Sequence, residues 1–200
     1  LNKCQVIPFG VDLSIYEKDY TKEVNDLKNK YGRFILSVGR LVYYKGYLNL
    51  LEAIKDISVK LLIIGSGPLK LKMDEYINNN NLVDKVFIID NHPNNIIPYY
   101  QACEFLVFPS NARSEAFGLV QIEAMACGKP VINTNLETGV PEVSLDNKTG
   151  LTVPVNDCQK LSEAIKLLWE DNDMCLQLGI NAKERAKEVE VFLTAYSIVF

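Results

Sequence analysis

Short apolar segments rich in β-branched residues alternate along this sequence with longer segments whose apolar residues recur at helical spacing. The predicted strands are 34–38, 60–64, 85–89, 105–108 and 130–133. The predicted helices are 45–57, 68–79, 96–102, 116–126, 157–171 and one from about 173 to 189. Because the strands are apolar on both faces and helices separate them, the pattern predicts an α/β fold, a Rossmann-like parallel sheet with helices on both faces.

Turn-forming residues follow several of these strands, at Gly39, at 65–68 and at 128–130. In open parallel sheets, ligands bind beyond the carboxyl ends of the strands, where helix N-termini point. We therefore expect the functional residues directly after the strands.

The composition limits the partners that the chain can bind. Hydrophobic residues make up 48% of the 200 residues and charged residues 23%, which suits one domain with a sizeable core. The net charge of −4 and the lack of a long basic run argue against a nucleic-acid partner. No apolar run is long enough to span a bilayer, so we expect neither a transmembrane segment nor a signal peptide.

The five cysteines are scattered, odd in number and without a CxxC pair. This usage predicts free thiols in a reducing compartment, and hence a cytoplasmic protein. The chain begins with Leu1 rather than methionine, so we expect it to be a fragment of a longer protein.

Two cations follow the first predicted strand. Residues 37–40 end in Gly39 and Arg40, and Lys45 precedes Gly46 at the start of the next predicted helix. A backbone that can come close, two cations and a helix N-terminus suit an anion such as a diphosphate. The alternative is that both cations are solvated surface residues.

A glycine-rich turn, residues 65–68, follows the second predicted strand and resembles part of a GxGxxG fingerprint. Lys70 stands where the third glycine belongs, and the turn follows a later strand rather than the first. A tight turn with Pro68 at the first helical position is therefore favoured over a dinucleotide site.

An almost entirely apolar helix, predicted over 116–126, has one carboxylate just before it and one in its middle. Glu115 precedes it and could cap it or reach a ligand, whereas Glu123 lies in its middle and needs a partner if it is buried. The two lie at most roughly 12 Å apart along a helix, so one extended ligand could touch both. The N–H groups of Phe117, Gly118 and Leu119 would be the unpaired donors of the helix start. The alternative is a capping Glu115 and a structural acceptor at Glu123.

The segment from Glu115 through Glu123 to residue 131 resembles the EX7E signature of retaining glycosyltransferases with the GT-B fold, most closely glycosyltransferase family four. Further segments are similar to the family's pattern in order and spacing: 6–12, 37–40 with 45–46, 63–68, 107–110, 139–142 and 148–151. The resemblance covers roughly residues 4–170. It implies the C-terminal half of a GT-B fold. The amino-acid sequences of 40–46 and 138–141 resemble those of enzymes that build bacterial surface polysaccharides.

The resemblance implies a role for each matching residue. Arg40 and Lys45 would hold the donor diphosphate and stabilise charge on the departing nucleotide, and Glu115 would bind the transferred sugar; these three are the predicted catalytic residues. Glu123 would bind the ribose. The loop 90–92 would flank the base, with Asp90 departing from the family's common glycine and His92 alternatively a loop residue without a catalytic role. The full predicted donor-binding set is Gly39, Arg40, Lys45, His92, Glu115, Phe117, Gly118, Leu119 and Glu123.

The resemblance also implies how the chain is organised. Residues 1–172 would form the donor-binding domain and 173–200 a C-terminal helical extension, with the family's N-terminal acceptor domain absent. The donor would be a UDP- or GDP-linked sugar, and a saccharide or lipid-linked acceptor would bind through the missing domain, leaving the isolated chain inactive. No cofactor, metal ion or nucleic acid is expected. The full enzyme would be cytoplasmic, with room for peripheral association at the inner face of the membrane.

Two other functions stay open. One is another GT-B sugar-nucleotide enzyme such as an epimerase, against which the EX7E segment with Arg40 and Lys45 argues. The other is a non-catalytic nucleotide- or NAD-binding module. The role of the apolar tail, residues 189–200, also stays open between core packing and contact with another domain, because its aromatic residues are four apart and would share one helical stripe.

Overall fold

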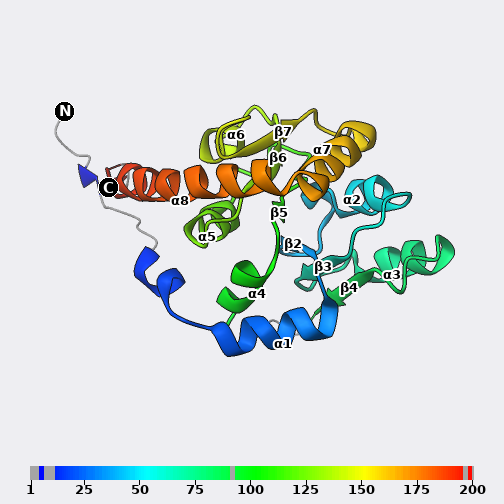
Figure 1. Cartoon of the computed structure of the whole chain (residues 1–200). Helices are drawn as coiled ribbons and strands as arrows, with labels where there is room; N and C mark the ends of the chain where they lie inside the picture. Colours follow the sequence, from blue (N-terminus) through cyan, green and yellow to red (C-terminus); the bar gives the residue numbers. More distant parts are fainter. Residues whose placement is uncertain (1–4, 7–11, 91–92, 196–197, 200) are drawn as a thin grey trace.

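A six-stranded parallel sheet in the order β4-β3-β2-β5-β6-β7 forms the centre of the molecule (Figure 1). The computed structural model describes residues 5–6, 12–90, 93–195 and 198–199, and the side chains of residues 12–90 and 93–189. The sheet consists of β2 (Ile35–Val38), β3 (Leu61–Ile64), β4 (Val86–Ile89), β5 (Leu106–Val107), β6 (Val131–Thr134) and β7 (Gly150–Val153). The parallel sheet is confirmed, and each of the five predicted strands is present.

The strand β7 was not predicted, because its first residue is a glycine, which indicates a turn when it is met in a sequence. In the sheet, a Cβ on Gly150 would come within 1.9 Å of the carbonyl oxygen of Val131. Gly150 therefore lets β7 approach β6 closely.

Helices cover both faces of the sheet, as predicted. They are α1 (Thr21–Tyr31), α2 (Tyr47–Ile54), α3 (Lys70–Asn79), α4 (Ile97–Ala102), α5 (Leu119–Ala126), α6 (Val140–Val143), α7 (Cys158–Glu170) and α8 (Asn172–Ala195), with 3-10 turns η1 (Leu13–Glu17) and η2 (Tyr43–Lys45). The short α6 and the polar α1, in which only Tyr31 is buried, were not predicted, because neither presents a wide apolar stripe.

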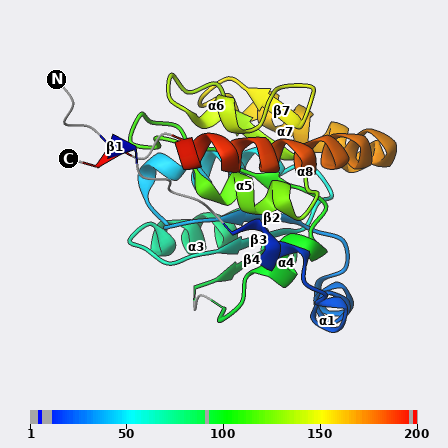
Figure 2. The same cartoon turned by 90° about the vertical axis from the view of Figure 1, so that its left-hand side faces the viewer.

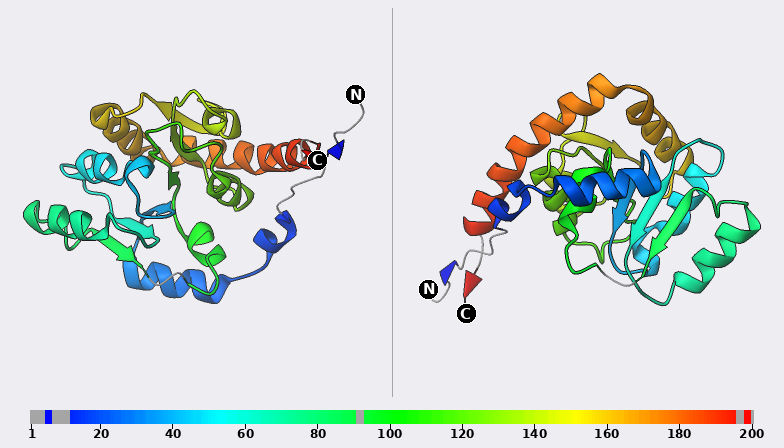
Figure 3. Two further views of the ribbon diagram at one scale, coloured as in Figure 1. Left: turned by 180° about the vertical axis from the view of Figure 1, so that it is seen from behind. Right: turned by 60° about the horizontal axis from the view of Figure 1, so that its bottom comes forward.

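The two faces of each strand carry separate cores. Ile35 and Ile63 pack against α2, α3 and α7, whereas Leu36 and Leu62 pack against α1, α4, α5 and α8. The strand register places Leu36 directly beside Leu62. Figure 3 shows these helical layers from two further directions.

The helix α8 lies across α5 (Figure 2). A Cβ on Gly179 would come within 2.3 Å of the Gly128 carbonyl oxygen, so the glycine permits this close approach. Ala182 and Ala186 of α8 are fully buried in the same core as α5. At the two ends of the described chain, β1 (Gln5–Val6) pairs antiparallel with β8 (Ile198–Val199). The side chains of the predicted aromatic stripe at 192, 196 and 200 lie outside the described ones.

Candidate functional site at the carboxyl edge of the sheet

The loops that leave β2 and β3 press against each other at the carboxyl edge of the sheet. Gly39 has φ +147° and Gly65 has φ +156°, and a Cβ on Gly65 would lie 1.9 Å from the Gly39 carbonyl oxygen. The hydroxyl of Tyr47 donates a hydrogen bond to the same oxygen at 3.0 Å. Burial and then the negative charge of Glu115 raise the pKa of Tyr47, so its phenol stays protonated and keeps donating. The β2 loop is thereby held in one conformation.

An ion pair between Lys45 and Glu115 forms the centre of the site. The Lys45 Nζ lies 2.5 Å from Glu115 Oε2, and the two side chains are only 12% and 10% exposed. The hydroxyl of Ser110 donates to the same carboxylate oxygen at 3.1 Å, and the Lys45 ammonium lies 4.8 Å from the centre of the Phe108 ring. The pair therefore joins the loop after β2 to the loop after β5, residues that are 70 positions apart in the sequence.

The local backbone at Gly46 makes this meeting possible. Gly46 is left-handed, with φ +69°, and follows η2 directly. A Cβ there would lie 1.9 Å from the Pro109 carbonyl oxygen, so only glycine lets the two loops touch. The predicted helix over 45–57 is wrong at its start: Lys45 ends η2, and α2 begins at Tyr47 after the left-handed Gly46.

The helix α5 begins at Leu119, three residues later than predicted, because Gly118 takes a left-handed conformation with φ +81°. A Cβ on Gly118 would lie 2.4 Å from the Phe108 ring. The N–H groups of Phe117 and Gly118 therefore precede the helix instead of opening it. Together with the N–H of Leu119 they have no acceptor within the described part of the chain. Unpaired N–H groups at a helix start favour an anionic ligand.

Glu115 does not cap α5, because no side chain accepts a hydrogen bond from the start of that helix. Of the two roles left open for Glu115 in the sequence, capping the helix is therefore wrong. Glu123 is half-buried rather than enclosed, and its Oε2 accepts a hydrogen bond of 2.6 Å from the hydroxyl of Tyr100 on α4. A structural acceptor, one of the two sequence-based alternatives, therefore describes part of what Glu123 does.

The structure brings some predicted residues together and leaves others apart. Gly39 contacts Lys45: a Cβ on Gly39 would lie 3.3 Å from Lys45 Cε. Arg40 is exposed and makes no ion pair with a described residue. Asp90, at the end of β4, is exposed and lies 3.9 Å from Lys70. His92 lies outside the described residues.

Buried amides that support the start of α5 were missed by the sequence reasoning. The Gln121 side chain donates to the Phe117 carbonyl at 2.8 Å and accepts a hydrogen bond from Asn133 at 3.0 Å. Asn133 Nδ2 also lies 3.2 Å from the carbonyls of Val140 and Ser144. A buried amide needs partners, so the polar residues inside an apolar helix and at the end of an apolar strand were the available signal.

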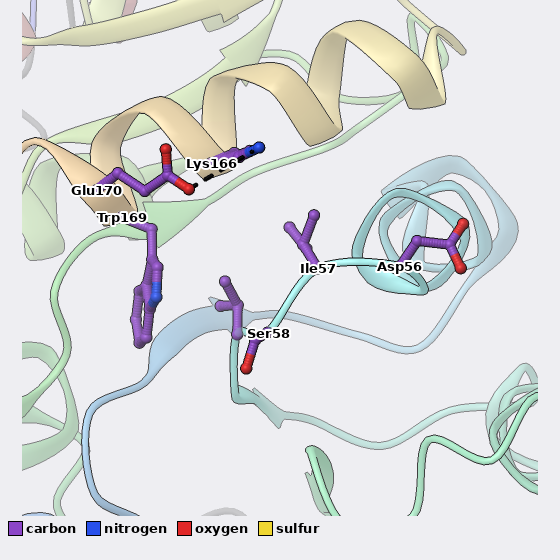
Figure 4. Close-up of a pocket in the computed structure, with 7 residues that line it drawn as sticks. Asp56, Ile57, Ser58, Lys166, Trp169 and Glu170 are labelled. Atoms are coloured by element: carbon purple, nitrogen blue, oxygen red, sulfur yellow. Dashed lines mark ion pairs between the residues drawn. The ribbon is translucent and has the colours of Figure 1, made fainter.

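One pocket of the described residues lies at the opposite edge of the sheet. A pocket of about 390 Å³ lies between the ends of α2 and α7 and is lined by Asp56, Ser58, Lys166, Trp169 and Glu170 among others (Figure 4). Helix C-termini, with their carbonyl oxygens, point to this edge, which disfavours an anion. None of the predicted site residues lines it.

Three further findings concern the described residues only. They contain no group of three or more His, Cys, Asp or Glu side chains arranged to hold a metal ion. Within the same part of the chain, no helix has both the length and the apolarity needed to cross a membrane. The cysteines among them, Cys103, Cys127, Cys158 and Cys175, are free thiols, as predicted; Cys4 lies outside the described residues.

Comparison with known proteins identifies the family to which the chain belongs. Residues 19–185 match the family model described as glycosyl transferases group 1, and the chain belongs to this family. It is 32% identical to D-rhamnosyltransferase WbpZ of Pseudomonas aeruginosa, over 94% of this chain and 49% of that protein. It is 31% identical to O-antigen chain mannosyltransferase C of Escherichia coli, over 94% of this chain and 51% of that protein. The chain thus spans about half the length of these curated relatives.

A solved structure supports the fold assignment. The crystal structure of Anabaena HepE in complex with UDP-glucose superposes with a TM-score of 0.84 at 25% identity, covering 95% of this chain and 55% of that one. The fold is therefore the Rossmann-like α/β domain found in GT-B glycosyltransferases, as the sequence predicted.

Proposed function

We propose that this chain is the donor-binding half of a retaining glycosyltransferase that moves a hexose-type sugar from a UDP- or GDP-linked donor to a saccharide or lipid-linked acceptor. The observation that carries the proposal is the buried Lys45–Glu115 ion pair, which puts a cation and a carboxylate beside each other at the carboxyl edge of the sheet. Support comes from the relatives, whose names describe transfer of rhamnose and mannose, and from the UDP-glucose bound to HepE.

The donor diphosphate would bind where α5 begins. Its oxygens would accept hydrogen bonds from the N–H groups of Phe117, Gly118 and Leu119, and Lys45 would be its counter-ion. Arg40 is exposed on the β2 loop and would take the remaining phosphate charge. Cations held next to the departing nucleotide stabilise the charge that develops on it, so the proposed reaction needs no metal ion.

The transferred sugar would bind to Glu115. An ionised carboxylate has about four acceptor positions, and the described residues use Oε2 for both Lys45 and Ser110. When Lys45 moves its charge to the diphosphate, Glu115 keeps the Ser110 hydrogen bond and can accept from sugar hydroxyls. The same carboxylate thus holds Lys45 in place before the donor binds and holds the sugar afterwards.

The acceptor would be held by a separate N-terminal domain of the full enzyme, because the proposed donor groups all belong to this half. The isolated chain would then bind donor nucleotide without transferring sugar. We place the reaction in the cytoplasm, where the free thiols stay reduced. A lipid-linked acceptor would bring the full enzyme to the inner face of the membrane.

Calorimetric titration of this chain with UDP, GDP and NAD tests the proposal. We expect UDP or GDP to bind and NAD to give no heat of binding. Lys45→Ala should weaken this binding, whereas Lys55→Ala, the control for loss of a surface cation, should leave it unchanged. Lys55 lies beyond the end of α2 and pairs with Glu52. Binding of NAD, or of no nucleoside diphosphate at all, would contradict the proposed function.

A further inference from the structure

Two tyrosines from different elements converge on the carboxylate of Glu123. Tyr100 of α4 is 0% exposed and donates its hydroxyl to Glu123 Oε2 at 2.6 Å. Tyr16 of η1 is 7% exposed, and the causes that raise its pKa are burial first and then the negative charge of Glu123. Both phenols therefore lie beside the same carboxylate.

The packing of these two side chains does not explain their hydroxyl groups. Phenylalanine would fill nearly the same volume as either tyrosine, whereas a buried hydroxyl has to be satisfied by a partner. Tyr100 satisfies its hydroxyl with one carboxylate oxygen only, Oε2. Glu123 also interacts with the Tyr16 phenol, because burial first, and then the charge of Glu123 and a hydrogen bond to it, raise the pKa of Tyr16. Since Glu123 is half-buried, its carboxylate stays accessible to a ligand.

The position of Tyr16 is fixed by the same helix that carries Tyr100. The side chain of Gln101, the next residue of α4, donates to the carbonyl oxygens of Tyr16 at 3.1 Å and Lys18 at 2.9 Å. At its other end, η1 is capped by Asp12, which accepts a hydrogen bond from the Ser14 N–H at 3.0 Å. Both tyrosines are thus held in place independently of any ligand.

We propose that Tyr100 and Tyr16 are positioning residues that fix the Glu123 carboxylate for a nucleotide whose ribose has both of its hydroxyls free. The inference rests on the proposed function, in which Glu123 meets the ribose. A carboxylate that accepts the Tyr100 hydrogen bond and lies beside Tyr16 is ordered before the ligand arrives, so it meets the ribose at a smaller ordering cost. The tyrosines act through Glu123, and they therefore make the site selective for ribonucleotides over 2′-deoxyribonucleotides.

The test compares Tyr100→Phe with Tyr99→Phe by titrating each with UDP, GDP and their 2′-deoxy forms. Tyr99 is the matched control, because it lies on the same helix and faces Lys30 and Tyr31 of α1 instead of Glu123. For whichever nucleotide binds the wild type, Tyr100→Phe should weaken the ribose form up to about 10-fold, because the freed Glu123 side chain then has to be ordered on binding. The 2′-deoxy form should weaken less than about 3-fold, and Tyr99→Phe should change neither.

A double variant separates positioning from general support of the fold. If Tyr100 acts through Glu123, Tyr100→Phe combined with Glu123→Gln should bind the ribonucleotide no more weakly than Glu123→Gln alone. Equal losses for ribose and deoxyribose forms, or additive losses in the double variant, would overturn the inference and leave the proposed function intact. If the wild type binds neither UDP nor GDP, the result contradicts both the inference and the proposed function. Should Tyr100→Phe fail to fold, Tyr16→Phe gives the same comparison, with a smaller loss.

Discussion

Replacement of Lys45 by alanine should separate its part in the buried ion pair from the anion binding that we propose for it. The change leaves Glu115, which is 8% exposed as a residue, with only the Ser110 hydroxyl as a partner. Removal of one member of a buried ion pair costs about 3 kcal/mol or more of unfolding free energy. In the double variant Lys45→Ala/Glu115→Gln no charge is left unpaired, so most of that loss should be recovered.

Binding should respond differently. A charge-assisted hydrogen bond contributes about 1.5–3 kcal/mol, so Lys45→Ala should weaken the nucleoside diphosphate roughly 10- to 100-fold. The matching nucleoside, which has no phosphate, should bind as before, and the salt dependence of diphosphate binding should flatten. The double variant should regain stability but not diphosphate affinity.

The assay combines urea unfolding with calorimetry on the wild type, Lys45→Ala, the double variant and Lys55→Ala. The reasoning is refuted if nucleoside and diphosphate lose the same affinity, because Lys45 would then support the fold without meeting the phosphates. It is also refuted if the double variant recovers binding together with stability.

Four further outcomes are expected. Glu123→Gln should weaken nucleotide binding by roughly 1–3 kcal/mol in a variant that stays folded, measured by calorimetry; unchanged affinity would rule out the ribose role. Gly118→Ala should destabilise the fold by about 1–3 kcal/mol in urea unfolding, because a Cβ there meets the Phe108 ring at 2.4 Å in a left-handed backbone. Burial raises the pKa of Cys103 from 9.0 to about 12, so the folded protein retains a proton that the unfolded chain loses, and stability should fall as the pH rises from 9 towards 12. Cys103→Ala should make that fall shallower by about 1.4 kcal/mol per pH unit, and an unchanged slope would contradict the assignment. The chain alone should transfer no sugar from UDP- or GDP-sugars to lipid-linked or oligosaccharide acceptors above background, and robust transfer would show that the acceptor site is here.

The sheet could be predicted from the sequence because apolar strands buried on both faces produce a local signal. The strand β7 could not, since the feature that lets it join the sheet is a glycine whose missing side chain makes room for Val131. The start of α5 was placed too early for a related reason. Residues 116–118 are compatible with a helix by themselves. In the structure the Phe108 ring, from another loop, packs against Gly118, and Gly118 takes the left-handed conformation that ends this possibility.

The candidate site was predictable as a set of residues and not as a set of contacts. Lys45 and Glu115 could each be proposed from the turn or the helix next to them, but their ion pair depends on loops that the sheet brings together. The Tyr100 hydroxyl on Glu123 was missed entirely, because nothing in an apolar helix indicates which carboxylate a tyrosine will face. Long-range polar contacts of this kind depend on how the helices and strands pack, and local sequence patterns do not report that packing.

The central claim is that a nucleoside diphosphate binds at the carboxyl edge of the sheet, where α5 begins. An amide NMR titration of this chain with UDP and with GDP tests it most directly, because it reports the place of binding residue by residue. We predict the largest shift changes at the N–H groups of Phe117, Gly118 and Leu119 and at Gly39. Changes centred instead on Trp169, in the pocket at the opposite edge, or no changes with either nucleotide, would contradict the account.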